Sequence, residues 1–169
     1  MKFQLNALKQ GRFKKEVVIS IPQDEVSKSG DTVYAKAYFL AHFVNVSDDE
    51  REAYQKQLAE LNNKVEKLEE DEDLSFSEKY QVQTELKNDI KALTNAFIKL
   101  YFVGFEKHPK HEFPFTDDSG KDLSDSEAVI DELLSVKLLR EEIVDTYNDE
   151  INKNQNEKLN KLLAGNLKK

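Results

Sequence analysis

The sequence predicts a mainly helical α+β protein with a small N-terminal antiparallel β unit, a long coiled-coil-like helical hairpin and two C-terminal helices. Of the 169 residues, 34% are charged and 38% hydrophobic, which is typical of long solvated helices around a small core. Only 5 Gly and 3 Pro interrupt the chain, whereas 10 Phe and 6 Tyr argue against general disorder. Apolar residues alternate near the N-terminus and follow a helical spacing after residue 47.

The N-terminal β unit is predicted over residues 1–46. Lys15–Ile21 is rich in β-branched residues and ends at Pro22, as a short strand does. A second strand is predicted over Thr32–Val44, because its residues alternate between a wholly apolar face and a more polar face. The apolar face consists of Val33, Ala35, Ala37, Phe39, Ala41 and Phe43. Two strands alone are marginally stable, so we expect this unit to pack on helices or on another subunit.

A helical domain is predicted over residues 47–150, beginning with a long antiparallel hairpin at about 48–103. Ser47–Glu50 and Ser75–Glu78 match the capping box that starts a helix. Each helix carries a narrow apolar seam with heptad spacing, and the acidic segment Glu69–Asp73 separates the two. The seams are Tyr54, Leu58, Leu61, Val65 and Leu68, and Leu86, Ile90, Leu93, Phe97 and Leu100. The hairpin is either packed only on itself or an arm that binds a partner.

The C-terminal part is predicted to contain a loop, two helices and a tail. His108–Ser124 is a loop, since it holds two Pro, a Gly and several Asp. A capping box at Ser124–Glu127 predicts a short amphipathic helix, and a longer helix follows from about Lys137. Residues 151–169 are predicted to be a polar tail. The whole chain is expected to form one folded domain.

Composition excludes several classes of function. The net charge of −8 disfavours the phosphate contacts that a nucleic-acid-binding protein makes. The absence of Cys excludes disulfides, thiol catalysis and thiolate metal sites. No apolar run is long enough to span a membrane, and the first residues lack the apolar core of a signal peptide. We therefore expect a cytoplasmic protein that contacts neither nucleic acid nor membrane.

Residues that could carry chemistry are few. Pro109 prevents His108 and His111 from sharing a helical face, so these two are predicted to be solvent-exposed loop residues that bind no metal. The third histidine, His42, lies on the more polar face of the second predicted strand. Asp117 begins a segment better explained by an Asx turn than by a calcium loop. No carboxylate pair has the shielded member that general acid catalysis needs. The sequence predicts no catalytic residue, no cofactor and no metal, and hence no enzyme.

Aromatic residues flank the long loop. Four Phe and one Leu of the short helix that follows form the candidate surface: Phe102, Phe105, Phe113, Phe115 and Leu134. These side chains either pin the loop onto the core or form a hydrophobic surface that holds apolar segments of another chain. We also expect the protein to be a homo-oligomer, because a two-stranded unit leaves unpaired backbone groups at its edges.

Eight short motifs follow one another along residues 1–50 and 97–150. They are Leu5-Asn6, Phe13-Lys14, Ile21-Pro22, Ala35–Phe43, Phe102–Phe105, Pro114–Thr116, Leu133-Leu134 and Ile143 to Tyr147. In this order, the motifs resemble those of the short tail assembly chaperones of long-tailed (siphovirus-type) bacteriophages. Phe105 stands where that family pattern has Trp, and residues 51–95 are longer and more coiled-coil-like than usual for it.

The resemblance implies a non-enzymatic protein of the infected bacterial cytoplasm that is absent from the mature virion. Such a protein coats the hydrophobic helical tape measure protein and keeps it soluble until the tail tube polymerises. It also implies a longer form, made by frameshifting near Lys168-Lys169, that would contact the tail tube protein. The alternative is a non-enzymatic helical-hairpin adaptor or structural protein with one defined partner. A chaperone binds its client in many copies, whereas an adaptor binds at a fixed low ratio.

Overall fold

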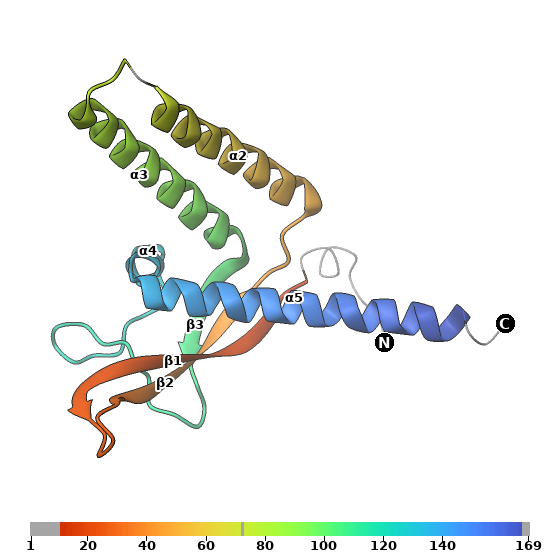
Figure 1. Ribbon diagram of the computed structural model, residues 1–169. Coiled ribbons are helices and arrows are strands. Elements are labelled where there is room, and N and C mark those ends of the chain that lie inside the picture. Colours follow the sequence, from red (N-terminus) through yellow and green to blue (C-terminus); the bar gives the residue numbers. More distant parts are fainter. Residues whose placement is uncertain (1–10, 72, 167–169) are drawn as a thin grey trace. The chain divides into compact units, whose positions relative to one another are not determined.

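The computed structural model describes residues 11–71 and 73–166, and the side chains up to residue 153 (Figure 1). Its elements are β1 (Phe13–Val26), β2 (Thr32–Phe43), α2 (Asp48–Glu70), α3 (Phe76–Tyr101), β3 (Phe102–Lys107), α4 (Glu127–Ser135) and α5 (Lys137–Asn166). The predicted α+β class is therefore confirmed. Leu5-Asn6 and Lys168-Lys169 lie outside the described residues. Among those residues, every helix is too short or too polar to cross a lipid bilayer.

The chain divides into two compact units. One holds Val44–Phe102, and the other holds Phe13–Phe43 together with the chain from Val103 onward. This division differs from the predicted boundary at residue 46, which separated the strands from all of the helices. The physical reason is that β1 packs against α5, so the first strands and the last helix share one core.

The sheet of the second unit has the strand order β1-β2-β3. β1 and β2 pair antiparallel from Phe13 opposite Phe43 to Pro22 opposite Tyr34, and the register shifts before Val26. β3 was not predicted, because the helical spacing of the second seam runs up to Leu100 and hides the strand that follows. β1 is an edge strand, where Pro22 is tolerated although it lacks a backbone N–H.

The predicted apolar face of β2 is buried where the sheet meets α5, which crosses β1 in Figure 1. The ring of Tyr147 on α5 lies 5.6 Å from that of Phe43 and 6.2 Å from that of Phe13. The buried residues on this face are Val17, Ile19, Phe39, Ala41 and Phe43.

The opposite face carries Lys14, Glu16 and His42, so the predicted polar face of β2 is present at this end of the sheet. Lys15 of β1 is the exception, because it lies on the α5 side, where its ammonium is 2.7 Å from the carboxylate of Glu150.

The first unit is the predicted helical hairpin. Both expected capping boxes are present: the hydroxyl oxygens of Ser47 and Ser75 accept hydrogen bonds from the backbone N–H groups of Glu50 and Glu78. The rings of Tyr54 and Phe97 stack at 4.1 Å between centroids. Most seam residues are only half-buried, as expected for two helices that cover one stripe of each other.

The ends of the hairpin and the C-terminal helices require three corrections. Leu100 is exposed instead of lying in the seam, and Ile98 and Tyr101 are buried in its place. The N-cap of α4 is Ser126 and not Ser124. The predicted tail from residue 151 is helical, because α5 continues to Asn166 without a Pro or an earlier Gly to end it.

Candidate functional site

An aromatic cluster holds the loop after β3 against the sheet. Phe105 lies on β3, and its ring centroid is 5.8 Å from that of Phe113 and 6.2 Å from that of Phe115. Phe115 also contacts Phe39 on β2 at 5.2 Å, edge to face. Rings at these separations attract one another beyond the area they bury, so the cluster fixes the course of the loop.

The five predicted contact residues have different environments. Phe105 is 3% exposed and Leu134 is fully buried, so both contribute to the core of their unit. Phe102 is also buried, but it belongs to the hairpin unit, where its N–H donates to the carbonyl of Ile98 at the end of α3. Only Phe113 and Phe115 are half-buried and have surface available to a partner.

A hollow of about 260 Å³ opens beside Phe115, where the loop meets α4 and the start of α5. Its lining is apolar apart from Thr116 and Glu132. The lining residues are Pro114, Phe115, Thr116, Leu123, Val129, Glu132, Leu133, Val136 and Leu139. Val136 is 46% exposed and is held in an extended conformation between the two helices. We refer to these nine residues as the apolar hollow.

Among the residues of the apolar hollow, the sequence predicted only Phe115 as a contact residue. The missed signal was Val136, a β-branched residue between two helices, where a solvated linker would carry a polar residue. Val129 and Leu133 belong to the apolar residues of the predicted short amphipathic helix. Helical periodicity does not show that these two residues border the apolar hollow, because that depends on the course of the loop.

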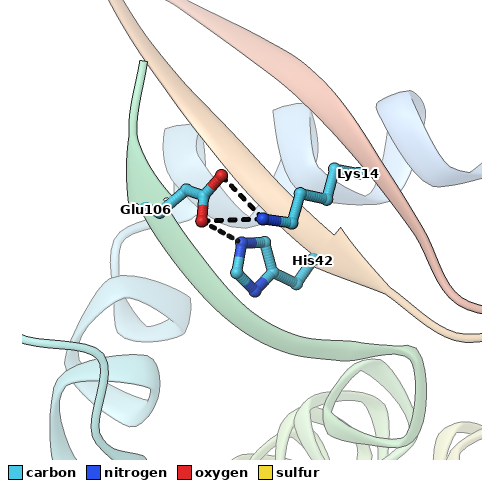
Figure 2. Close-up of polar contacts among 3 residues, drawn as sticks. All are labelled: Lys14, His42 and Glu106. Atoms are coloured by element: carbon cyan, nitrogen blue, oxygen red, sulfur yellow. Dashed lines mark hydrogen bonds and ion pairs between the residues drawn. The ribbon is translucent and has the colours of Figure 1, made fainter. Parts of the chain in front are cut away.

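The polar face of the sheet is linked across its three strands by one carboxylate. Figure 2 shows Glu106 of β3 pointing toward Lys14 of β1 and His42 of β2. The Lys14 ammonium donates to both carboxylate oxygens at 2.8 Å, and His42 Nε2 lies 3.1 Å from one of them. The hydrogen bond from Lys14, followed by the charges of Lys14 and His42, lowers the pKa of Glu106 despite partial burial.

A second polar group lies on the same face. The backbone N–H of His111 donates to the carbonyl of His108 at 3.3 Å, which closes a turn over Pro109. His108 Nε2 lies 2.9 Å from a carboxylate oxygen of Glu16 on β1, and the His111 ring stacks on Tyr38 at 3.9 Å. His108 is 9% exposed, so the prediction of a solvent-exposed residue is wrong for it. The turn folds back on the sheet instead of extending into solvent.

The carboxyl groups with displaced pKa values in the described part of the chain share one property. Hydrogen bonds lower the pKa of Glu50, Glu78, Glu106 and Asp117. A lowered pKa keeps a carboxylate ionised, which suits a hydrogen-bond acceptor and not a general acid. Asp117 accepts from the N–H groups of Ser119 and Lys121, so the predicted Asx turn is confirmed.

Comparison with protein-family models, with curated proteins and with solved structures finds no match to this chain. Conclusions about function therefore depend on the apolar hollow, the aromatic cluster and the exposed faces of the helices.

Proposed function

We propose that this chain is a tail assembly chaperone of a long-tailed bacteriophage, which coats the tape measure protein and keeps it soluble until the tail tube polymerises. The observation that carries the proposal is the apolar hollow beside Phe115. Phe115 and the neighbouring half-buried Phe113 are two of the five predicted contact residues, and they extend the apolar surface along the loop.

The hollow suits the apolar side chains of an amphipathic helix. A tape measure protein is a long helical chain that exposes apolar stripes, and such a helix inserts side chains at regular spacing into a partner's groove. Burying one large aliphatic side chain contributes about 1.5–3 kcal/mol before the cost of ordering is subtracted. Each contact is therefore weak and reversible. Strength comes from many copies of the chaperone along one client.

The charge of the chain fits the same task. At a net charge of −8, copies bound along a client repel neighbouring complexes and keep the assembly in solution. The proposed protein is non-enzymatic, acts in the cytoplasm of the infected bacterium and is absent from the mature virion. A longer frameshifted form would add the contact with the tail tube protein.

The experiment compares two matched substitutions in one unit. Val136 lines the apolar hollow and is 46% exposed, whereas Val103 lies on β3, outside the hollow, and is 44% exposed. Each is replaced by Asp and co-expressed with the long helical protein encoded by a neighbouring reading frame. We expect Val136→Asp to shift the client into the insoluble fraction, because a carboxylate in the hollow opposes burial of an apolar side chain. Val103→Asp should keep the client soluble.

The proposal also predicts the ratio of the two proteins. Purified complexes should contain many copies of this chain for each client, as measured by light scattering with quantitative amino-acid analysis. Circular dichroism confirms that both variants are folded. If the client stays soluble with Val136→Asp, or is equally lost with Val103→Asp, the hollow is not the binding site. A fixed one-to-one complex would contradict the chaperone function itself.

One observation favours the alternative, a helical-hairpin adaptor with one partner. Phe76 and Tyr80 lie one turn apart on α3 beside the acidic turn of the hairpin, and they are 85% and 65% exposed. Adjacent exposed aromatic residues are typical of a binding surface. If the protein is an adaptor, replacing both by Ser should abolish a complex of fixed low ratio, whereas Val136→Asp should leave that complex intact.

A further inference from the structure

The polar face of the sheet brings together three side chains that could bind a metal ion. Glu16 comes from β1, and His108 and His111 come from the turn over Pro109. Each offers one ligand atom, and these atoms all lie within 4.8 Å of one another. We refer to these residues as the Glu16–His108–His111 cluster. It is separate from the apolar hollow and from Glu106 with its partners.

The arrangement is close to what a divalent ion of the zinc type requires. Bonds of about 2.0–2.2 Å in a tetrahedral site place two ligand atoms about 3.3 Å apart. The Glu16 oxygen and His108 Nε2 are already 2.9 Å apart. The remaining adjustment falls on His111, which is exposed and can turn about its side-chain bonds.

His108 is held in place for this role. It is 9% exposed, and the rings of His108 and His111 lie 4.7 Å apart between centroids. The His111 ring stacks on Tyr38 at 3.9 Å between centroids, and this contact changes when the ring turns toward the ion. Imidazole nitrogen with carboxylate oxygen is a ligand set that zinc and neighbouring transition metals prefer over magnesium or calcium.

The proton on His108 must move for a metal to bind. Its Nδ1 accepts a hydrogen bond from the backbone N–H of Lys110 at 3.2 Å, so in the metal-free protein the ring proton is on Nε2, facing Glu16. When the ion takes the Nε2 lone pair, the proton transfers to Nδ1 through solvent. The Nδ1–H and the Lys110 N–H are then two donors facing each other, so the turn must shift until each donates to water. This rearrangement reduces the affinity for the ion.

We propose that Glu16, His108 and His111 bind one divalent transition-metal ion, with water completing its coordination. The ion would join the turn to β1 and so fix the start of the loop that carries Phe113 and Phe115. It would act as a structural clamp for the apolar hollow. The site itself does not depend on the proposed chaperone function, since binding requires no client.

The experiment titrates Co²⁺ into the full chain after chelator treatment and follows its visible absorption, with Zn²⁺ added in competition. Three matched variants are compared: Glu16→Gln, His111→Gln and His42→Gln. His42 is the control, because it is a third histidine on the same sheet face but contacts Glu106 instead of the cluster. We expect one ion per chain and an absorption band of tetrahedral intensity.

Loss of either ligand should weaken Co²⁺ binding at least about tenfold, since removing even an outer-shell partner of a ligand has an effect of this size. The His42→Gln variant should bind as the parent chain does. Limited proteolysis supplies a second readout: Zn²⁺ should protect the loop after His111 in the parent and in His42→Gln, and not in His111→Gln. Absence of stoichiometric binding, or equal weakening in all three folded variants, would overturn the proposal.

Discussion

Phe105 and Phe115 belong to one aromatic cluster, but their surroundings give them different roles. Phe105 is 3% exposed, whereas Phe115 is half-buried and lines the apolar hollow. Sequence spacing places both beside the same loop and assigns both to the same surface. Their difference in burial means that a substitution at one acts on stability, while a substitution at the other acts mainly on the surface that a client would contact.

At the residue scale we predict that Phe105→Ala lowers the free energy of unfolding by about 3–5 kcal/mol, because it removes a buried ring and leaves a cavity. Urea denaturation followed by circular dichroism measures the change. Tyr34→Ala is the control in the same unit: this residue is 59% exposed, so its change should remain within about 0.5 kcal/mol. Equal stability of Phe105→Ala and the parent chain would show that Phe105 is not a core residue.

At the scale of elements, the two long helices begin in the same way. Ser47 and Ser75 each exchange hydrogen bonds with the glutamate three residues later, and those bonds lower the pKa of Glu50 and Glu78 from the usual 4.5. A negative charge in the first turn also interacts favourably with the helix dipole. The hydrogen bonds and the dipole interaction are both strongest when the carboxylate is ionised.

We predict that the hairpin loses stability as the pH falls below about 4.5, through the lowered pKa values of Glu50 and Glu78. The sign follows from linkage: a carboxyl group with a depressed pKa in the folded state stabilises that state when ionised, and the contribution disappears on protonation. The double variant Glu50→Gln with Glu78→Gln should have a smaller loss between about pH 7 and pH 3.5, because Gln still accepts the capping hydrogen bond without titrating.

The measurement is the urea midpoint of the helical signal at both pH values. Ser75→Ala provides a second check, since removal of an N-cap side chain costs about 0.5–2 kcal/mol at neutral pH. An identical acid response in the parent chain and in the double variant would mean that other carboxyl groups, such as Glu106, cause the loss.

At the scale of the whole molecule, the edge strand β1 bears on assembly. It is the first strand in the order β1-β2-β3 of the described sheet, and its far end carries Ile21 and Val26, which are 40% and 72% exposed. An edge with exposed β-branched side chains is a template for pairing with another strand. A second copy of the chain would cover both the backbone groups and these side chains.

We predict that the protein self-associates, with a mass above 19.6 kDa that rises with concentration. Light scattering after size-exclusion chromatography measures it. Replacing Ile21 and Val26 by Lys should shift the protein toward the monomer, because lysine on an edge disfavours pairing. Lys in place of the exposed Val103 on β3 serves as the control. A monomer of 19.6 kDa at all concentrations would contradict the prediction.

The sequence by itself determined the parts of this protein whose causes lie within a few residues. The capping boxes at Ser47 and Ser75, the seams of the hairpin and the alternation of β2 all follow from near-neighbour hydrogen bonds and from periodicity. Two predictions from local pattern were wrong by small shifts: the N-cap of α4 is Ser126 instead of Ser124, and Leu100 is exposed instead of lying in the seam.

Only the tertiary structure decided what lies side by side. β3 forms because Phe102–Lys107 finds a neighbouring strand, and the apolar hollow exists because the loop returns beside α4. Likewise, Glu16 meets His108 across a gap in sequence that no spacing rule covers, and Pro109 brings His111 toward His108 through a turn instead of a helical face. The physical reason is that these contacts depend on long-range strand pairing and packing, whose partners local propensity and periodicity do not specify.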